Sequence, residues 1–475
     1  MSERYRHTKI IATLGPATES EDKLRWLISG GVDVVRLNMA HASEEWTSSV
    51  VRDIRRVSGE VGRHVAIMMD VKGPEIRTAY LEETVNLEPG DPIDFVTSAD
   101  SDPGEEGVPR IGVNYPGLAD DIEVGNTMLV DSGLIQLTVK EKTATRVRCE
   151  VLTPGRLGSR RHINLPGVKV SLPSLTEKDR TDVRLGAALG VDFFALSFVR
   201  EAIDLKALRS LLEESGSRAR IIAKIEDQSA LRNLPEIVAE ADGVMVARGD
   251  LGIEIDYHQL PIVQERIVKV CLAEGKPVII ATHLLESMIS SPVPTRAEIS
   301  DVANAVKEQA DCVMLSGETT TGLYPEASVE VLRRIVLSIE AADPGRTALN
   351  ETIELKTPKA KMLRAAAVLA AELGGAGIVV FTRSGFLPFV LAALRPRGVP
   401  IYAFTDIEEV FRQMLILWGV EPFLMEFSED PETTIENAFA YLRRRQWCAG
   451  GDHLVVVTNA LARERIVDTV QLREV

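Results

Sequence analysis

The sequence predicts an α/β fold: a (β/α)8 TIM barrel with an inserted small all-β lid domain and a C-terminal α/β domain. The first observation is an alternation of apolar, strand-like runs with helical segments, which yields three strands before residue 73 and five after residue 173. Parallel strands joined by helices produce this rhythm, and eight of them close a barrel. The second observation is that the rhythm stops in between, where short strand-like runs alternate with turns.

The predicted domains follow from these changes of rhythm: residues 1–73 and 173–340 form the barrel, 74–172 the lid domain and 341–475 the C-terminal domain. The first part of the barrel contains strands Thr8–Gly15, Val32–Met39 and Val65–Val71, with helices Glu21–Ser29 and Glu44–Gly59 between them. Its second part begins with a helix capped by Ser174 or Thr176, and continues with strands Asp192–Phe198, Arg220–Lys224, Gly243–Ala247, Pro277–Thr282 and Cys312–Leu315.

The lid domain shows no long helical period, and turn signals such as Pro89-Gly90-Asp91 separate its short runs. Its predicted strands are Thr84–Leu87, Ile93–Val96, Thr127–Val130, Leu134–Val139 and Arg146–Val151. After a linker near residues 341–350, the C-terminal domain has three helix–strand alternations. They are Lys361–Leu373 with Gly377–Phe381, Phe386–Ala393 with Pro400–Phe404, and Thr434–Arg444 with His453–Thr458.

Composition restricts the class of protein. The 475 residues are 45% hydrophobic and 26% charged, as in ordinary globular proteins, and the net charge of −16 argues against a general nucleic-acid binder. Four cysteines lie far apart without a CxxC pair, which favours a reducing compartment over disulfides or a zinc site. The first residues lack the apolar core of a signal peptide, and no apolar run is long enough to span a membrane. We therefore expect a cytoplasmic enzyme without nucleic-acid or membrane partners.

Polar residues follow seven of the eight predicted barrel strands. In a (β/α)8 barrel the carboxyl ends of the strands form one rim, and active sites lie there. A structural barrel does not require polar groups on one rim only, so the set favours a functional site. Its members are Arg36, Asn38, His41, Asp70, Lys72, Glu75, Arg77, Ser197, Arg200, Lys224, Glu226, Arg248, Asp250, Thr282, His283, Ser316, Gly317, Glu318 and Thr319.

Two carboxylates from adjacent strands, Glu226 and Asp250, could hold a divalent cation, since Mg2+ typically takes one or two protein carboxylates plus water and phosphate. Lys224 would point across the same mouth. Several arginines, one lysine and a metal suit phosphoryl transfer, which needs positioning and charge neutralisation. Neither a Walker loop nor GxGxxG occurs, so arginines and metal would have to hold any nucleotide. The alternative is that Lys224–Glu226 and Arg248–Asp250 are merely structural ion pairs.

Several longer motifs resemble the pyruvate kinase family. They are TKIIATLGPAT from Thr8, VVRLN-x-x-H at Val34–His41, KGPEIRT at Lys72–Thr78, NLPG at Asn164–Gly167, KIE at Lys224–Glu226, DGVMVARGDLGIEI at Asp242–Ile255, LLESMI at Leu284–Ile289, PTRAEISDVANAV at Pro294–Val306 and MLSGET at Met314–Thr319. The resemblance covers residues 8–335 and is weaker beyond. It implies a glycolytic phosphotransferase that moves the phosphoryl group of phosphoenolpyruvate to ADP, giving pyruvate and ATP through an enolate that is then protonated.

The resemblance also implies roles for individual residues. Lys224, Thr282, Arg36, Ser316 and Glu318 match the family's catalytic positions: Lys224 stabilises the phosphoryl group and the enolate, Thr282 lies where the enolate is protonated, and Ser316 and Glu318 match a proton relay. Arg36, Lys224, Gly249, Asp250 and Thr282 match the substrate site, and Asn38, His41, Arg77 and Arg161 the nucleotide site. Glu226 and Asp250 match the ligands of Mg2+ or Mn2+. The family is usually tetrameric, which implies a homotetramer.

Two regions depart from the family pattern. The potassium site would use Asn38 and Asp70, but Ala40 and Val71 stand where the family has hydroxyls, so we expect at most a weak K+ site although Glu75 is present. In the C-terminal domain, Phe386 and Leu387 replace hydroxyl residues of the family's effector loop, and no Gly-rich loop follows Asn459. Since anion cradles need those donors, an ordinary α/β packing domain is favoured over a fructose-bisphosphate site, and a different effector remains open.

Two rival functions share part of this pattern. A metal-dependent barrel enzyme that acts on pyruvate or phosphoenolpyruvate by C–C chemistry, such as an aldolase, would use a metal, an arginine and an enolate. It would need neither the lid domain nor the KGPEIRT block. A non-catalytic regulatory homologue would bind ligands only, and the presence of Lys224, Glu226, Asp250 and Thr282 argues against it.

Overall fold

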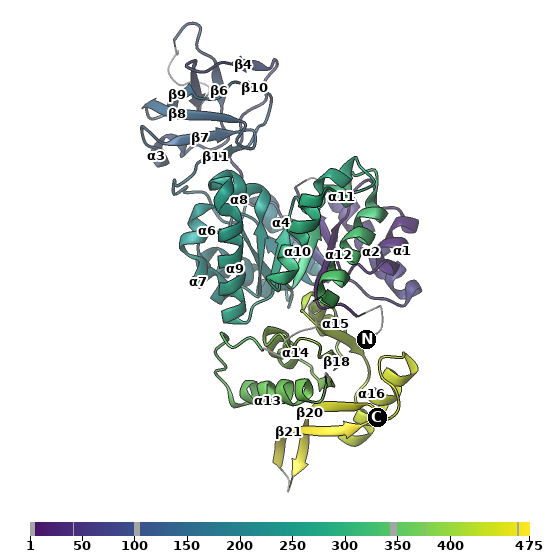
Figure 1. Ribbon diagram of the computed structural model, residues 1–475. Coiled ribbons are helices and arrows are strands. Elements are labelled where there is room, and N and C mark those ends of the chain that lie inside the picture. Colours follow the sequence, from purple (N-terminus) through teal and green to yellow (C-terminus); the bar gives the residue numbers. More distant parts are fainter. Residues whose placement is uncertain (1–4, 41, 99–104, 343–348, 375, 463–464) are drawn as a thin grey trace.

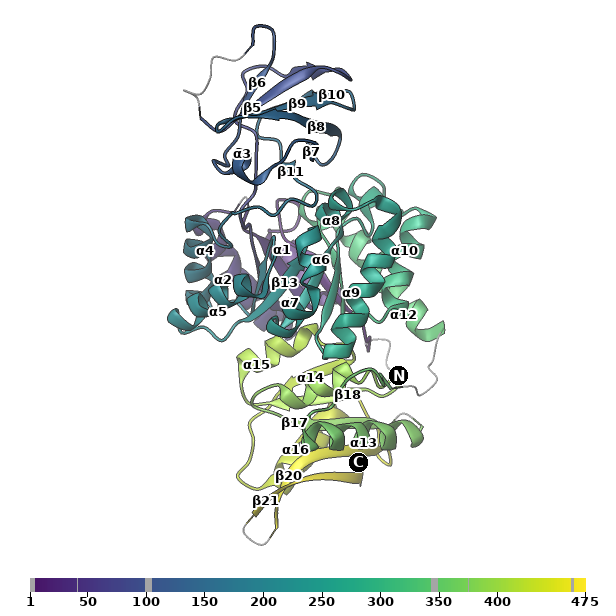
Figure 2. The ribbon, with the colours of Figure 1, turned by 90° about the vertical axis from the view of Figure 1, so that its left-hand side faces the viewer.

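The computed structural model describes residues 5–40, 42–98, 105–342, 349–374, 376–462 and 465–475. Three bodies are stacked in a row, with the barrel between the lid domain and the C-terminal domain (Figures 1 and 2). The lid domain lies at one end of the barrel and the C-terminal domain at the other. This arrangement confirms the predicted fold class.

The central body is a closed, all-parallel barrel in the order β1-β16-β15-β14-β13-β12-β3-β2. Its strands are β1 (Lys9–Thr13), β2 (Val34–Asn38), β3 (Ala66–Val71), β12 (Phe193–Leu196), β13 (Arg220–Ile225), β14 (Gly243–Ala247), β15 (Val278–Ala281) and β16 (Cys312–Leu315). β2 pairs with both β1 and β3. β3 also pairs with β12, although the inserted lid domain separates these two strands in the sequence. The eight predicted strands are therefore those that close the barrel.

Helices surround the barrel because each strand is buried on both faces and must be covered from outside. They are α1 (Glu21–Ser29), α2 (Glu44–Val61), α4 (Glu177–Ala188), α5 (Ala202–Glu214), α6 (Gln228–Arg232), α7 (Leu234–Glu240), α8 (Arg248–Glu254), α9 (Leu260–Glu274), α10 (Arg296–Lys307), α11 (Gly317–Thr320) and α12 (Pro325–Ala342). Short 3-10 turns occupy Tyr257–Gln259 and Glu286–Ile289. Of the two residues considered as cap of α4, Thr176 forms the capping box with Asp179.

The lid domain is built on a six-stranded sheet in the order β11-β7-β8-β9-β5-β6, with a separate β10-β4 pair. The elements are β4 (Val85–Leu87), β5 (Pro92–Val96), β6 (Arg110–Gly112), α3 (Leu118–Asp121), β7 (Thr127–Val130), β8 (Ile135–Lys142), β9 (Arg146–Val151), β10 (Gly155–Leu157) and β11 (Ile163–Asn164). β6, β10 and β11 were not predicted, because runs of two or three residues carry no periodicity.

The C-terminal domain contains a five-stranded sheet in the order β19-β18-β17-β20-β21. Its elements are α13 (Pro358–Glu372), β17 (Gly377–Phe381), α14 (Phe386–Ala393), β18 (Ile401–Thr405), α15 (Glu408–Gln413), a 3-10 turn Met414–Ile416, β19 (Val420–Leu424), α16 (Pro431–Arg444), β20 (His453–Ala462) and β21 (Arg465–Glu474). Three strands were predicted for this sheet, and the structure has five. β19 is an edge strand that contains Pro422, and β21 pairs antiparallel with β20 in a hairpin without an intervening helix.

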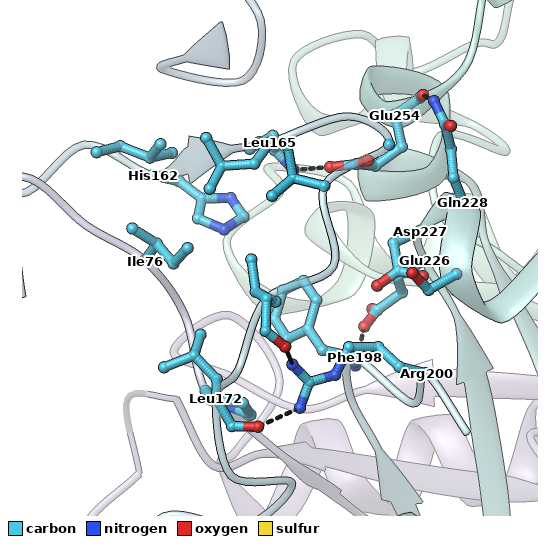
Figure 3. A pocket seen from close by; sticks show the side chains of 17 residues that line it. Ile76, His162, Leu165, Leu172, Phe198, Arg200, Glu226, Asp227, Gln228 and Glu254 are labelled. Carbon is cyan, nitrogen blue, oxygen red and sulfur yellow. Dashed lines mark hydrogen bonds between the residues drawn. The ribbon is translucent and has the colours of Figure 1, made fainter. Parts of the chain in front are cut away.

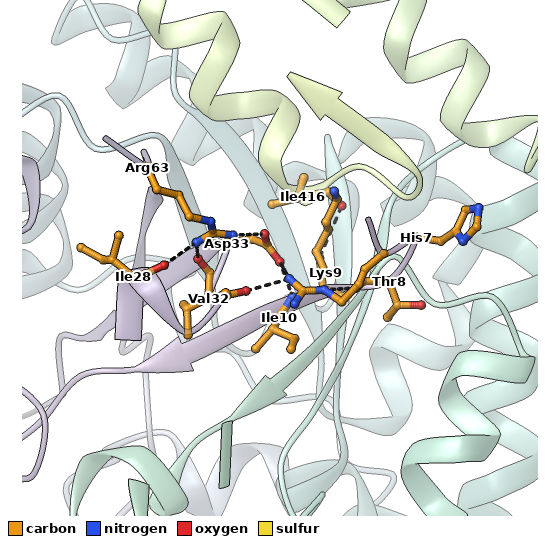
Figure 4. A network of polar contacts seen from close by, with 12 residues as sticks. His7, Thr8, Lys9, Ile10, Ile28, Val32, Asp33, Arg63 and Ile416 are labelled. Carbon is orange, nitrogen blue, oxygen red and sulfur yellow. Dashed lines mark hydrogen bonds and ion pairs between the residues drawn. The ribbon is translucent and has the colours of Figure 1, made fainter. Parts of the chain in front are cut away.

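Buried ion pairs lie at the end of the barrel that faces the C-terminal domain. Asp33 is paired with Arg63 at 2.8 Å and also with Arg6 (Figure 4). Lys9 donates from Nζ to the carbonyl oxygen of Val420, 2.7 Å away, and so reaches β19. Although burial opposes ionisation, the neighbouring cations hold the pKa of Asp33 below its ordinary value. The bond from Lys9 thus joins the barrel to the C-terminal domain on the side opposite the lid domain.

None of the helices in the described ranges is both long and apolar enough to cross a membrane.

Candidate active site

A chain of alternating charges crosses the carboxyl ends of β2, β3 and β13, on the side of the barrel nearest the lid domain. Arg36 contacts Asp70 at 2.7 Å, Asp70 contacts Lys224 at 3.2 Å, and Lys224 contacts Glu226 at 2.8 Å. Ser197 accepts a hydrogen bond from Lys224 Nζ at 2.6 Å and donates one to Asp70 at 3.2 Å. Five of the strand-end residues grouped from the sequence therefore form one connected network.

Lys224 points into this network, and its side chain is only 10% exposed. Burial alone would lower the pKa of its ammonium group. The carboxylates of Asp70 and Glu226 outweigh that effect and raise the pKa above its ordinary value. Lys224 therefore carries a permanent positive charge at the barrel mouth.

Glu226 is a buried acid whose negative charge is only partly balanced by its neighbours. It is 1% exposed, and its Oε2 accepts a hydrogen bond of 2.6 Å from the backbone N–H of Phe198. Burial raises its pKa to about 7; Lys224 acts in the opposite direction, and the negative charge of Asp250 adds to the increase. Two carboxylates that repel each other inside a buried site suit a divalent cation, which would supply the missing positive charge.

Asp250 belongs to α8, the short helix that begins directly after β14. The preceding Gly249 donates its backbone N–H to Thr282 Oγ1 at 2.8 Å, and that hydroxyl donates to the carbonyl oxygen of Ala281 at 2.7 Å. Thr282 and His283 both have positive φ, 66° and 54°. Such backbone strain is held only by a surrounding structure, and it concentrates at functional sites. The structure thus brings Thr282 against the start of α8.

Arg248 does not form the ion pair with Asp250 that was the structural alternative. Its guanidinium forms an ion pair of 2.8 Å with Asp301 and donates to the carbonyl oxygens of Ala281 and Thr282. These bonds from Arg248 stabilise the strained backbone at Thr282. The other part of that alternative, an ion pair between Lys224 and Glu226, is present, within the larger network.

Ser316 and Glu318 follow β16 and lie beside the segment that follows β15. Glu318 is 1% exposed, and its carboxylate accepts backbone N–H bonds from Leu285 at 3.0 Å and Ser316 at 2.8 Å. It thereby ties together the segments after β15 and β16. Ser316 Oγ is buried and lacks a hydrogen-bond partner among the described residues. Its hydroxyl is therefore available for a proton-relay role, while Glu318 holds the backbone beneath it.

The predicted nucleotide residues are more dispersed. Arg77 pairs with Glu75 at 2.7 Å, and Arg161 pairs with Asp131 at 3.2 Å; both arginines are more than a third exposed. Asn38 Oδ1 accepts the backbone N–H of Ala40 at 3.2 Å. His41 lies outside the described residues. Arg77 and Arg161 belong to the chain at the base of the lid domain, where Arg77 bridges to His162 and Arg161 precedes it.

A narrow cleft of about 60 Å3 lies between the lid domain and the barrel (Figure 3). Glu226 and Phe198 line it from the barrel, and His162 and Asn164 line it from the lid domain. Burial lowers the pKa of His162, which favours its neutral form. His162 and Phe198 were assigned no role from the sequence, because only the pairing of the two bodies brings them together.

The chain matches two family models. The pyruvate kinase barrel domain matches residues 5–329, and the pyruvate kinase alpha/beta domain matches residues 360–471. Plastidial pyruvate kinase 2 of Arabidopsis thaliana is 38% identical over 99% of this chain and 81% of the relative. Pyruvate kinase of Staphylococcus aureus strain USA300 is 40% identical over 95% of this chain and 77% of the relative.

A solved structure gives the same result. The crystal structure of a pyruvate kinase from Cryptosporidium parvum has a TM-score of 0.93 and 33% sequence identity, and the match covers 99% of this chain and 96% of that one. The two family models together match the barrel, the inserted lid domain and the C-terminal domain, and the relatives span nearly the whole chain. The chain belongs to the pyruvate kinase family.

Proposed function

We propose that the network at the barrel mouth carries out the family's reaction, the transfer of a phosphoryl group from phosphoenolpyruvate to ADP. The product is ATP, together with an enolate that takes up a proton to become pyruvate. The observation that carries this assignment is the inward-facing ammonium of Lys224, in contact with both Asp70 and Glu226. A structural ion pair would not need Arg36, Ser197 and a second carboxylate around it.

The family's reaction requires a divalent metal, and we assign Mg2+ or Mn2+ to Glu226 and Asp250. The donor set supports this assignment, because both groups are carboxylates, the oxygen ligands that Mg2+ and Mn2+ take in proteins. The raised pKa of Glu226, caused by burial and in part by Asp250, fits a site completed by a cation. When bound, the metal supplies positive charge to the oxygens of the phosphoryl group and the enolate.

Lys224 and Arg36 supply fixed positive charge from the protein itself. Both are held by Asp70, at 3.2 and 2.7 Å, so neither must reorganise during the reaction. Negative charge that develops on the phosphoryl group or the enolate is stabilised by charges already in place. Asp70 thus acts as the residue that orients two cations.

Thr282 is assigned to the face of the enolate that receives the proton. Its hydroxyl oxygen is held by the N–H of Gly249 on one side and by the carbonyl oxygen of Ala281 on the other. The strained backbone fixes the hydroxyl close to the start of α8, where the substrate carboxylate is assigned to Gly249 and Asp250. Ser316, with its unpartnered Oγ, is assigned to the proton path, and Glu318 to positioning Ser316.

The nucleotide phosphates are assigned to Arg77 and Arg161, with Asn38 and His41 as further members. The two arginines pair with Glu75 and Asp131, and both guanidinium groups are more than a third exposed. Ion pairs of partly exposed groups contribute little to stability, so phosphates can replace these carboxylates at low cost. For K+ we assign at most a weak site at Asn38 and Asp70, because Asp70 is already engaged by two cations.

We also propose that the protein is cytoplasmic and forms a homotetramer. All four cysteines are free, and three of them are buried, which supports a reducing compartment. The tetramer rests on family membership alone, and sedimentation of the purified chain tests it.

The decisive test of the function is whether the purified protein makes ATP and pyruvate from phosphoenolpyruvate and ADP in the presence of Mg2+. Aldolase-type C–C chemistry would consume pyruvate or phosphoenolpyruvate without forming ATP. A non-catalytic homologue would bind Mn2+ but turn over neither substrate. Either result would refute the proposal.

A further inference from the structure

One side-chain contact joins the lid domain to the helix that carries Asp250. Asn164 Nδ2, at the end of β11, donates a hydrogen bond of 3.0 Å to Oε1 of Glu254, the last residue of α8 (Figure 3). The two residues are 5% and 7% exposed. The amide oxygen of Asn164 has no partner among the described residues, so the bond to Glu254 is the polar link of this side chain.

The end of α8 is also held from the barrel. Gln228, at the start of α6, donates from Nε2 to the backbone oxygen of Glu254 at 2.6 Å. Gln228 comes two residues after Glu226, which stands at the end of β13. Glu254 is therefore in contact with both the lid domain and the segment that bears the other metal-binding carboxylate.

Helix α8 has seven residues, and it is held at both ends. At its start, the N–H of Gly249 is bound to Thr282; at its end, Glu254 is bound to Asn164. Asp250 and Glu254 are four residues apart, so they lie one helical turn from each other on the same face. A displacement of Glu254 by the lid domain is thus passed along one turn of helix to Asp250.

We propose that Asn164 and Glu254 are positioning residues that connect the position of the lid domain to the placement of Gly249 and Asp250. The inference rests on the proposed function, since it concerns the substrate and metal site. When Asn164 is drawn toward the barrel, α8 is held in the position that presents Asp250 next to Glu226. When the lid domain moves away, the end of α8 loses its bond to Asn164 and keeps only the bond from Gln228 to its backbone.

The burial of Glu254 supports a functional reason for this contact. Burial raises its pKa to about 7, Asn164 lowers it, and the charges of Asp227 and Asp250 raise it further. Two polar side chains buried at this junction lose free energy unless they are hydrogen-bonded to each other, so the bond fixes the position of the lid domain relative to α8.

The test compares variants in the full-length protein. Asn164→Leu removes the donor at similar size, Asn164→Asp replaces it with an acceptor, and Glu254→Gln keeps the acceptor oxygen and the bond. Lys169→Met is the matched control, because Lys169 joins the chain near the base of the lid domain to Glu201, the residue before α5, at 2.8 Å. Mn2+ affinity is measured by electron paramagnetic resonance, with KM for phosphoenolpyruvate and kcat measured separately.

We expect both Asn164 variants to bind Mn2+ about tenfold more weakly and to raise KM for phosphoenolpyruvate about tenfold, the size of one lost buried hydrogen bond. Glu254→Gln and Lys169→Met should stay within about threefold of wild type in both quantities. Hydrogen exchange should increase in residues 248–254 of the Asn164 variants while their melting curves remain cooperative.

The proposal is wrong if a folded Asn164 variant binds Mn2+ like wild type, or if Glu254→Gln weakens binding as much as the Asn164 variants do. Should Asn164→Leu not fold, Asn164→Asp decides by the same criteria. Failure of the proposed function looks different: wild type itself would then form no ATP, whereas Mn2+ affinities would still report on the Asn164–Glu254 contact.

Discussion

Replacing Lys224 with methionine tests the reaction at its most constrained residue. Methionine keeps most of the side-chain length but removes the ammonium that lies 2.8 Å from Glu226 and 3.2 Å from Asp70. Asp70 keeps its ion pair of 2.7 Å with Arg36. Glu226 keeps only the N–H of Phe198 among its hydrogen bonds within the described residues, and it can take up a proton because its pKa is already raised to about 7 by burial.

These contacts set the expected magnitudes. Removing one preorganised charge from a buried active site costs about 10²- to 10³-fold in kcat, or roughly 3–4 kcal/mol of transition-state stabilisation. Breaking a buried ion pair costs about 3–5 kcal/mol of stability when a charge is left alone. Here the loss should be smaller, about 2 kcal/mol, because Arg36 still neutralises Asp70 and Glu226 can be protonated. Turnover should therefore collapse in a protein that remains folded.

The assay follows pyruvate formation at saturating phosphoenolpyruvate, ADP and Mg2+, with Mn2+ binding measured on the same preparation. Lys269→Met is the control, because Lys269 forms an exposed ion pair with Glu265 on α9, away from the site. We expect this variant to match wild type. A Lys224→Met enzyme within about threefold of wild-type turnover would refute the assigned role, since no preorganised charge would then have been lost.

The remaining predictions concern ions, effectors, the domain junction and pH. K+ should activate the enzyme less than about threefold, because Ala40 and Val71 supply no hydroxyl oxygens to hold the ion; strong activation in rate assays with and without K+ would contradict this. Sugar phosphates, fructose bisphosphate included, should leave the apparent KM for phosphoenolpyruvate unchanged, and a sharp decrease during titration would show the C-terminal domain to be an effector site. Arg395→Ala should lower the free energy of unfolding by about 3–5 kcal/mol in denaturant titrations with little change in KM, since it leaves the buried carboxylate of Asp311 without its ion pair; a loss below about 1 kcal/mol would be inconsistent. Glu254→Gln should become more stable relative to wild type as the pH rises from 5 to 8. Burial raises the pKa of Glu254 in the folded protein to about 7, from an ordinary 4.5. The free energy of unfolding of wild type is therefore highest below pH 4.5 and decreases as the pH rises through 7. The gain is at most about 3 kcal/mol, and equal melting shifts at both pH values would disprove it.

The barrel could be predicted from the sequence because its strands are buried on both faces and end in polar residues. Apolar runs such as Val244–Ala247 mark the strands, and the residues after them mark the rim. The C-terminal sheet was harder to predict. Pro422 interrupts the β19 pattern, and β21 joins by a hairpin that the expected helix–strand alternation does not include.

The sequence predicted which residues lie at the candidate site but not where their side chains point. Spacing along the chain places Arg248 and Lys224 alike after a strand, yet Arg248 turns to Asp301 and Lys224 to Asp70. Asp70 itself was expected at the rim and as a ligand of a weak K+ site. Its contact with two cations depends on the neighbouring positions of β2, β3, β12 and β13 around the barrel, which no local pattern encodes.

The charges of the network explain why a divalent ion and a phosphorylated substrate belong together in this site. With Glu226 ionised, the two cations and three carboxylates of the network, Arg36, Asp70, Lys224, Glu226 and Asp250, carry one net negative charge. A phosphate ester alone is repelled by such a site. A divalent cation reverses the sign, so that the same side chains attract the substrate and then favour the charge that develops on the enolate. Because burial and Asp250 oppose the ionisation of Glu226, a divalent cation bound between the two carboxylates would favour the ionised form and so complete the charges of the site.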